Sequence, residues 1–61
     1  MHYKYEPIIG YSVPVVRVSN DMGRVLFTLS FDVNGTFLGS SSHLIITEQT
    51  LHDAWEAWTR K

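Results

Sequence analysis

One segment of the chain alternates large apolar residues with smaller or polar ones and then runs into Asn34-Gly35. This combination constrains the fold more than any other feature. Every second residue is large and apolar in Val25, Phe27, Leu29, Phe31 and Val33. A period of two is typical of a β-strand with one buried face, which we expect to span Arg24 to Val33. Because Asn-Gly favours a type I′ turn, the sequence predicts a β-hairpin here.

A two-residue turn would fix which residues face each other across this hairpin. The predicted pairs are Val33 with Thr36, Phe31 with Leu38, Leu29 with Ser40, and Phe27 with Ser42. The inward-facing side chains of the third strand would then be small where those of its neighbour are large. This leaves space for bulky side chains such as the two tryptophans of the C-terminal segment. The stretch from Gly39 to Ser42 suits a strand poorly, and a β-bulge there would exchange the faces of residues 43–46.

Two further segments precede this hairpin. Val13 to Ser19 reads as a strand whose start is confined to an edge or a bulge by Pro14. The polar turn residues 20–23 then connect it to the alternating segment. Residues 2–11 can add a short edge strand, although a proline and a glycine interrupt them.

The C-terminal segment predicts an amphipathic helix. Thr47 is a suitable N-cap, and Glu48 lies in the first turn, where the helix dipole favours a negative charge. A single apolar stripe is formed by Leu51, Ala54, Trp55 and Trp58. We therefore predict one α+β domain over residues 1–61, with a three-stranded, or with residues 2–11 four-stranded, antiparallel sheet. The helix would pack on one face, with its tryptophans over the alternating strand.

The size and composition of the chain limit what it can do. A domain of 61 residues has a marginal core, and the absence of cysteine removes disulfides and thiolate metal sites. Good packing or oligomerisation would have to supply the missing stability. The net charge of −1 argues against a strongly charged partner. No apolar run is long enough to span a bilayer and the first residues do not resemble a signal peptide, so we expect a cytoplasmic location and no membrane contact.

No pattern in the sequence predicts catalysis, a cofactor or a small-molecule substrate. Ser40–Ser42 lie near His43, but neighbouring strand residues point to opposite faces and no nucleophile-elbow motif is present. The helical triplet Glu48, His52 and Glu56 could bind a metal between subunits, but a solvated polar face is the preferred interpretation. The glycines form no phosphate-binding loop. We expect no catalytic residue and no metal.

Three antiparallel strands followed by a helix resemble, in topology alone, the sheet-type DNA-binding domains of certain plant transcription factors and of integrase arm-binding modules. Such domains carry many basic residues on the exposed sheet face, because phosphate contacts supply much of their affinity. This chain has five lysines and arginines in all, and the outward positions of the alternating strand end in Asp32. Nucleic-acid binding is therefore the less favoured alternative.

The side of the sheet away from the helix is the predicted contact surface. It would carry Leu26 and Thr28 from the alternating strand, and the hairpin register adds Phe37, His43 and Ile45. The tyrosines Tyr3, Tyr5 and Tyr11 would extend this surface or fold back over it. Alternatively, the N-terminal segment covers this face and completes a core.

These features favour a non-enzymatic protein-binding module, acting as a homodimer or docked on a larger protein. Chains of this kind are common among small accessory regulators and inhibitors, including those of bacteriophages and mobile elements. That expectation comes from size, whereas the contact surface comes from the residues themselves.

Overall fold

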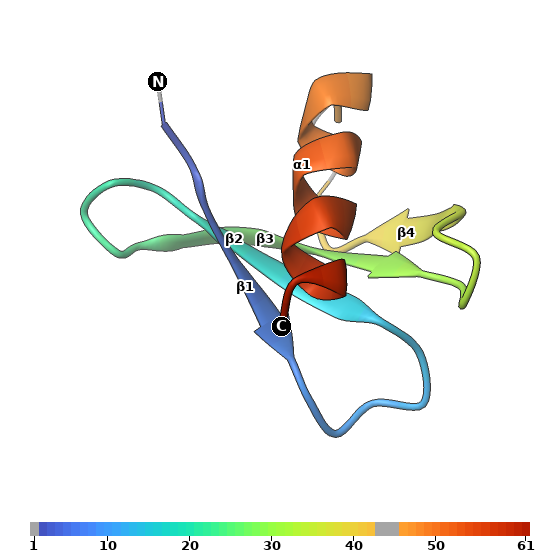
Figure 1. The fold of residues 1–61 in the computed structure, drawn as a ribbon. Helices are drawn as coiled ribbons and strands as arrows, with labels where there is room; N and C mark the ends of the chain where they lie inside the picture. Colours follow the sequence, from blue (N-terminus) through green and yellow to red (C-terminus); the bar gives the residue numbers. More distant parts are fainter. Residues whose placement is uncertain (1, 43–45) are drawn as a thin grey trace.

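The computed structural model describes residues 2–42 and 46–61, which form a four-stranded antiparallel sheet and one helix. The elements are β1 (Lys4–Ile8), β2 (Val15–Ser19), β3 (Val25–Phe31), β4 (Phe37–Ser40) and α1 (Glu48–Thr59). The strands lie side by side in chain order, and α1 crosses one face of the open sheet (Figure 1). The α+β prediction is confirmed. The sheet has the fourth strand that residues 2–11 were expected to be able to add, and this strand is β1.

The core lies between the sheet and the helix. In β2, Val16 and Val18 are fully buried, and they pair with Leu29 and Phe27 of β3. The buried cluster consists of Val16, Val18, Phe27, Leu29, Phe31 and Ala54. Period-two alternation in β2 and β3 therefore sends one set of side chains toward α1, as the sequence predicts for the middle of the alternating strand.

The ends of the alternating strand differ from the prediction. Val33 is 81% exposed and Val25 is 50% exposed, so neither belongs to the core. A shift in register between β2 and β3 pairs Val25 with Ser19, while Val18 still pairs with Phe27. Leu26 is thus an extra residue in β3, a β-bulge that removes Val25 from the inward-facing set.

The turn between β3 and β4 is also longer than predicted. Gly35 has φ = 91°, but no non-glycine residue among those described has a positive φ, so Asn34 does not adopt a type I′ conformation. Asp32 is the cause: its Oδ1 accepts hydrogen bonds from the backbone N–H groups of Asn34 and Thr36, each at 2.9 Å. The Gly35 N–H donates to the Asp32 carbonyl at 3.1 Å. Residues 33–35 form the loop.

This longer loop changes the register beside it. Phe31 pairs with Phe37 rather than with Leu38, and a bulge then restores the predicted pairing of Leu29 with Ser40. The bulge lies at Leu38, one residue before the segment in which it was considered. Because β4 ends at Ser40, the predicted pair of Phe27 with Ser42 falls outside the strand. The faces predicted for residues 43–45 lie outside the described residues.

The helix begins and packs as its sequence pattern predicts. Thr47 is the N-cap, and its Oγ1 accepts a hydrogen bond from the Thr50 N–H at 3.2 Å. Ala54 is fully buried, and Leu51, Trp55 and Trp58 pack against the core around it. The ring centroids of Trp55 and Phe31 are 5.4 Å apart. Across the described residues, no helix has the length and apolar character needed to cross a bilayer.

Both edges of the sheet carry features that interrupt pairing. β1 contains Pro7, which has no backbone N–H to offer to another strand. β4 has four residues and includes the Leu38 bulge. Short, bulged or proline-containing edge strands are poor templates for a further strand.

Candidate binding site on the uncovered sheet face

The second face of the sheet carries the alternate set of side chains from the first three strands. Opposite pairs on this face are Glu6 with Arg17, Ile8 with Val15, Arg17 with Thr28, and Val15 with Ser30. In the part of the chain that the structure describes, α1 packs on the other face (Figure 1). The second face is therefore accessible, and it mixes aliphatic groups, hydroxyls and one ion pair.

A hollow of about 230 Å³ lies on this face at the end of the sheet where β1 finishes and β2 begins. Its lining residues are Ile8, Tyr11, Val13, Val15, Arg17, Thr28 and Ser30. Val15 forms the floor and is only 7% exposed. The loop between β1 and β2 forms one wall through Tyr11 and Val13. A hydrogen bond of 2.9 Å from the Phe31 N–H to the Pro14 carbonyl ties the end of that loop to β3.

The charges beside the hollow form a cross-strand pair. Arg17 Nη1 lies 3.2 Å from Glu6 Oε1, and the two side chains are 41% and 64% exposed. An exposed pair of this kind contributes about 0–1 kcal/mol to stability. Its main consequence is that the face presents one positive and one negative group next to each other.

Three of the predicted contact residues lie on or beside this face. Thr28 and Tyr11 line the hollow, and Tyr11 is 67% exposed. Leu26, at the bulge of β3, is 37% exposed near the opposite end of the sheet. His43 and Ile45 are outside the described residues.

Phe37, Tyr3 and Tyr5 lie on the helix side instead, which corrects their predicted position. Phe37 shares the face of Phe31 because of the shifted register, and their ring centroids are 6.1 Å apart. Tyr3 lies 6.4 Å from Phe27 by ring centroids, and Tyr5 is paired with the buried Val18. Both tyrosines pack against the core because β1 joins the sheet as a regular strand.

Four residues of the hollow were not expected on the contact surface: Ile8, Val13, Val15 and Arg17. The signal for two of them was present, since Val15 and Arg17 alternate with the buried residues of β2. Ile8 and Val13 could not be placed in the same way. Their positions depend on where β1 ends and on how the following loop folds back.

A second, larger hollow of about 400 Å³ lies between β1 and the helix. It is lined by Tyr5, Asp53, Glu56, Ala57 and Arg60. Burial of the Tyr5 phenol and, secondarily, the charge of Asp53 raise its pKa above the ordinary value, and a side-chain hydrogen bond with Thr50 acts in the opposite direction. Glu56 is ion-paired with Arg60. The charged groups that line this second hollow are largely engaged with one another, so the hollow offers fewer free polar groups to a partner than the first one does.

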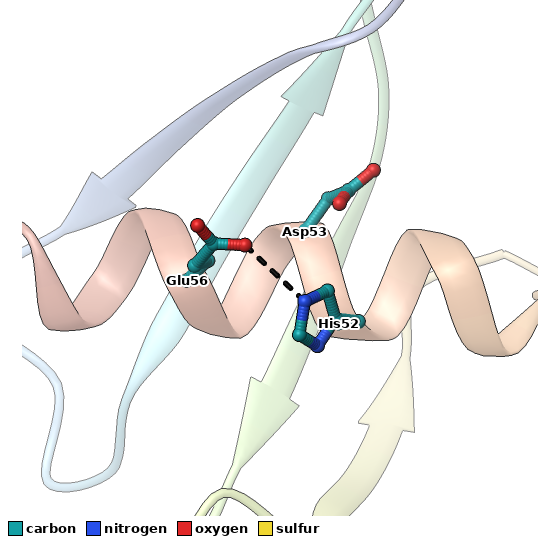
Figure 2. Close-up of side chains that lie close together, drawn as sticks. All are labelled: His52, Asp53 and Glu56. Atoms are coloured by element: carbon teal, nitrogen blue, oxygen red, sulfur yellow. Dashed lines mark ion pairs between the residues drawn. The ribbon is translucent and has the colours of Figure 1, made fainter.

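Three side chains of α1 that could bind a metal come close together, as Figure 2 shows. The ligand atoms of His52, Asp53 and Glu56 lie within 4.8 Å of one another, so Asp53 takes the place that the sequence pattern suggests for Glu48. His52 Nε2 is 3.3 Å from Glu56 Oε2, and Asp53 accepts a hydrogen bond from Gln49 at 2.9 Å. The His52 side chain is 71% exposed. We interpret the cluster as a solvated helix surface held by neighbouring-turn contacts.

Comparison of the chain with protein-family models, with curated proteins and with solved structures gave no match. The class is therefore defined by the fold and the site. The chain is a small α+β protein with an open four-stranded antiparallel sheet, one C-terminal helix packed against it, and a hollow on the other face.

Proposed function

We propose that this chain is a non-enzymatic protein-binding module that acts through its uncovered sheet face. The observation that carries the proposal is the hollow on that face, which has an aliphatic floor at Val15 and hydroxyl groups at Thr28 and Ser30. Protein interfaces combine apolar contact with a polar rim in this way. A small accessory regulator or inhibitor located in the cytoplasm is the corresponding biological role.

The hydrophobic side chains around the face support the same proposal. Tyr11 stands at the edge of the hollow and is largely exposed, and Val25 and Leu26 expose further apolar surface at the other end of the sheet. Tyrosine is favoured in interfaces because its ring adds apolar area and its hydroxyl can form a hydrogen bond. A continuous face with these groups is better suited to a protein surface than to a small polar molecule.

The alternative, sheet-type nucleic-acid binding, has less support. On the uncovered face Arg17 is paired with Glu6, so its charge is partly compensated. Phosphate binding depends on several uncompensated lysines and arginines. Retention on heparin that is lost at moderate salt would favour this alternative over protein binding.

The absence of cysteine from the chain allows a direct test by site-specific photo-crosslinking. Lys4→Cys places a unique thiol at the rim of the uncovered face, since Lys4 is exposed and alternates with Tyr5. Gln49→Cys places a matched thiol on the exposed surface of α1. Each variant, labelled with a benzophenone maleimide, is irradiated both as purified protein and in an extract of the host.

We expect protein adducts from the Lys4→Cys variant and few from Gln49→Cys. A second change, Val13→Asp, should remove those adducts, because it places a charge in the wall of the hollow. Circular dichroism must show that this double variant is folded. Equal labelling from the two thiols, or none from either, would contradict the proposed function.

A further inference from the structure

We propose that the uncovered sheet face binds a second copy of this chain in a symmetric, face-to-face dimer. The inference rests on the proposed function and names the partner at that same surface. It depends on the arrangement of charges on the face, on the position of the hollow relative to those charges, and on the balance of buried and exposed apolar residues.

The charges on the face complement those of an identical face. Glu6 and Arg17 are direct cross-strand neighbours on β1 and β2, and both side chains remain accessible. A twofold axis that runs between the two strands, parallel to them, places Glu6 of each copy against Arg17 of the other. Two ion pairs then become a four-membered charge cluster with alternating signs.

The same axis also brings the apolar parts together. Ile8 and Val15 are paired with each other one step along from the charged residues, at the end where the hollow lies. Rotation about the axis therefore places the two hollows against each other. Tyr11, at the edge of each hollow, gains a neighbour in the other copy.

A second copy also fits better than a strongly charged partner. Glu6 and Arg17 match each other, and Lys4 adds one positive charge at the rim, so the face has too little net charge to select a highly acidic or basic protein. The chain as a whole has a net charge of −1, so two copies repel each other little.

The distribution of apolar side chains gives the dimer a reason to form. Among the described residues, seven hydrophobic residues are buried, whereas eight large ones are exposed, including Tyr11 beside the hollow. Domains of this size commonly gain stability from a partner subunit. Burial of the β1–β2 part of the face would move Tyr11 and the two hollows into a shared interface.

Sedimentation equilibrium of the purified wild-type chain is the first test. We expect a species of twice the 7.0 kDa chain mass that dissociates on dilution. The charge variants Glu6→Arg and Arg17→Glu should each weaken the dimer by about ten-fold or more. In either variant, positions 6 and 17 carry the same sign, so the two faces of the dimer repel each other. Gln49→Lys, on the exposed surface of α1, is the control and should leave the dimer unchanged.

Mixing the two charge variants gives the sharper result. One face then carries two positive groups and the other two negative groups, so the mixture should associate about as tightly as the wild type. The double variant Glu6→Arg/Arg17→Glu should dimerise on its own. It also restores the cross-strand pair within the chain, so it remains informative if a single variant folds poorly.

A monomer at all accessible concentrations, or charge variants that fail to associate when mixed, would overturn the dimer. The crosslinking experiment separates this outcome from failure of the proposed function. If the Lys4→Cys adducts form in the host extract but not with purified protein, the face binds a different protein. If they form in neither, both proposals fail.

Discussion

The indole ring of Trp55 lies directly against the backbone of Gly35. A Cβ atom added to Gly35 would lie 2.7 Å from Trp55 Cε2 and 2.8 Å from Nε1, and Gly35 also has φ = 91°. The loop between β3 and β4 and the packing of α1 therefore depend on the same residue. Glycine satisfies both requirements because it has no side chain and adopts positive φ without strain.

Replacement of Gly35 by alanine should lower the free energy of unfolding by about 2–4 kcal/mol, because backbone strain and overpacking against Trp55 add together. Gly23→Ala is the matched control. Gly23 has φ = 85° but nothing within 4 Å of the added methyl group, so strain alone should cost about 1 kcal/mol. Urea denaturation followed by tryptophan fluorescence measures both. Equal losses would show that Trp55 does not press on Gly35 in solution.

Two leucines of the same hairpin should respond very differently to truncation. Leu29 is fully buried, whereas Leu38 is 57% exposed at the β4 bulge. Leu29→Ala should cost about 2–5 kcal/mol, enough to unfold much of a marginally stable domain. Leu38→Ala should change the free energy of unfolding by about 0.5 kcal/mol or less. A large loss at Leu38 would mean that this residue is inward, as a two-residue hairpin turn predicts.

The sequence predicts the order and class of the elements because each depends on local periodicity. The alternation in β3 and the stripe of α1 both persist in the structure, and Thr47 is the observed N-cap. The strand ends could not be predicted in the same way. The Asp32 side chain reshapes the turn between β3 and β4, and the bulge at Leu38 absorbs the resulting mismatch in register. A separate bulge at Leu26 changes the pairing of β3 with β2. Such side-chain-to-backbone contacts compete with the turn type that Asn-Gly favours.

The N-cap of α1 gives a third test. Thr47→Ala removes the acceptor for the Thr50 N–H and should lower the free energy of unfolding by about 1 kcal/mol. Thr59→Ala removes a hydroxyl at the other end of the helix, where it donates to the Glu56 carbonyl at 2.9 Å, and should have a smaller effect. Thermal unfolding by circular dichroism compares the two. If Thr59→Ala is the more harmful change, capping by Thr47 contributes little to stability.

The raised pKa of Tyr5 predicts a loss of stability in alkali. Burial, and then the charge of Asp53, favour the protonated phenol in the folded chain, so the folded state holds this proton more tightly than the unfolded state does. The resulting stabilisation is present in full below about pH 10, the ordinary tyrosine value, and is lost as the pH rises through the higher folded pKa. Tyr5→Phe should flatten this alkaline decline.

Asp53→Asn provides the control for this effect. Removal of the Asp53 charge should lower the Tyr5 pKa toward its ordinary value and reduce the alkaline loss only in part, since burial is the larger cause. Urea midpoints between pH 8 and 11, together with the phenolate absorbance, measure both changes in the same samples. An unchanged decline in Tyr5→Phe would assign the alkaline sensitivity to other groups.

The contact surface was harder to predict than the fold, because a register shift of one residue moves a side chain to the other face of the sheet. Phe37 moved to the helix side through a shift of one residue, and Tyr3 and Tyr5 did so because β1 is a regular strand. Ile8 and Val13 line the same hollow because the loop between β1 and β2 folds back, which the sequence pattern does not predict. Period-two patterns locate two faces but do not say where each strand ends.

The interrupted edges of the sheet also limit how copies of this chain can assemble. Pro7 removes a hydrogen-bond donor from β1, and the short, bulged β4 provides little straight backbone at the opposite side. Growth by addition of strands, which would propagate into fibres, is therefore disfavoured at both borders. In the proposed dimer the twofold axis pairs the β1–β2 part of the broad face with itself, so this contact closes at two copies and cannot propagate to a third.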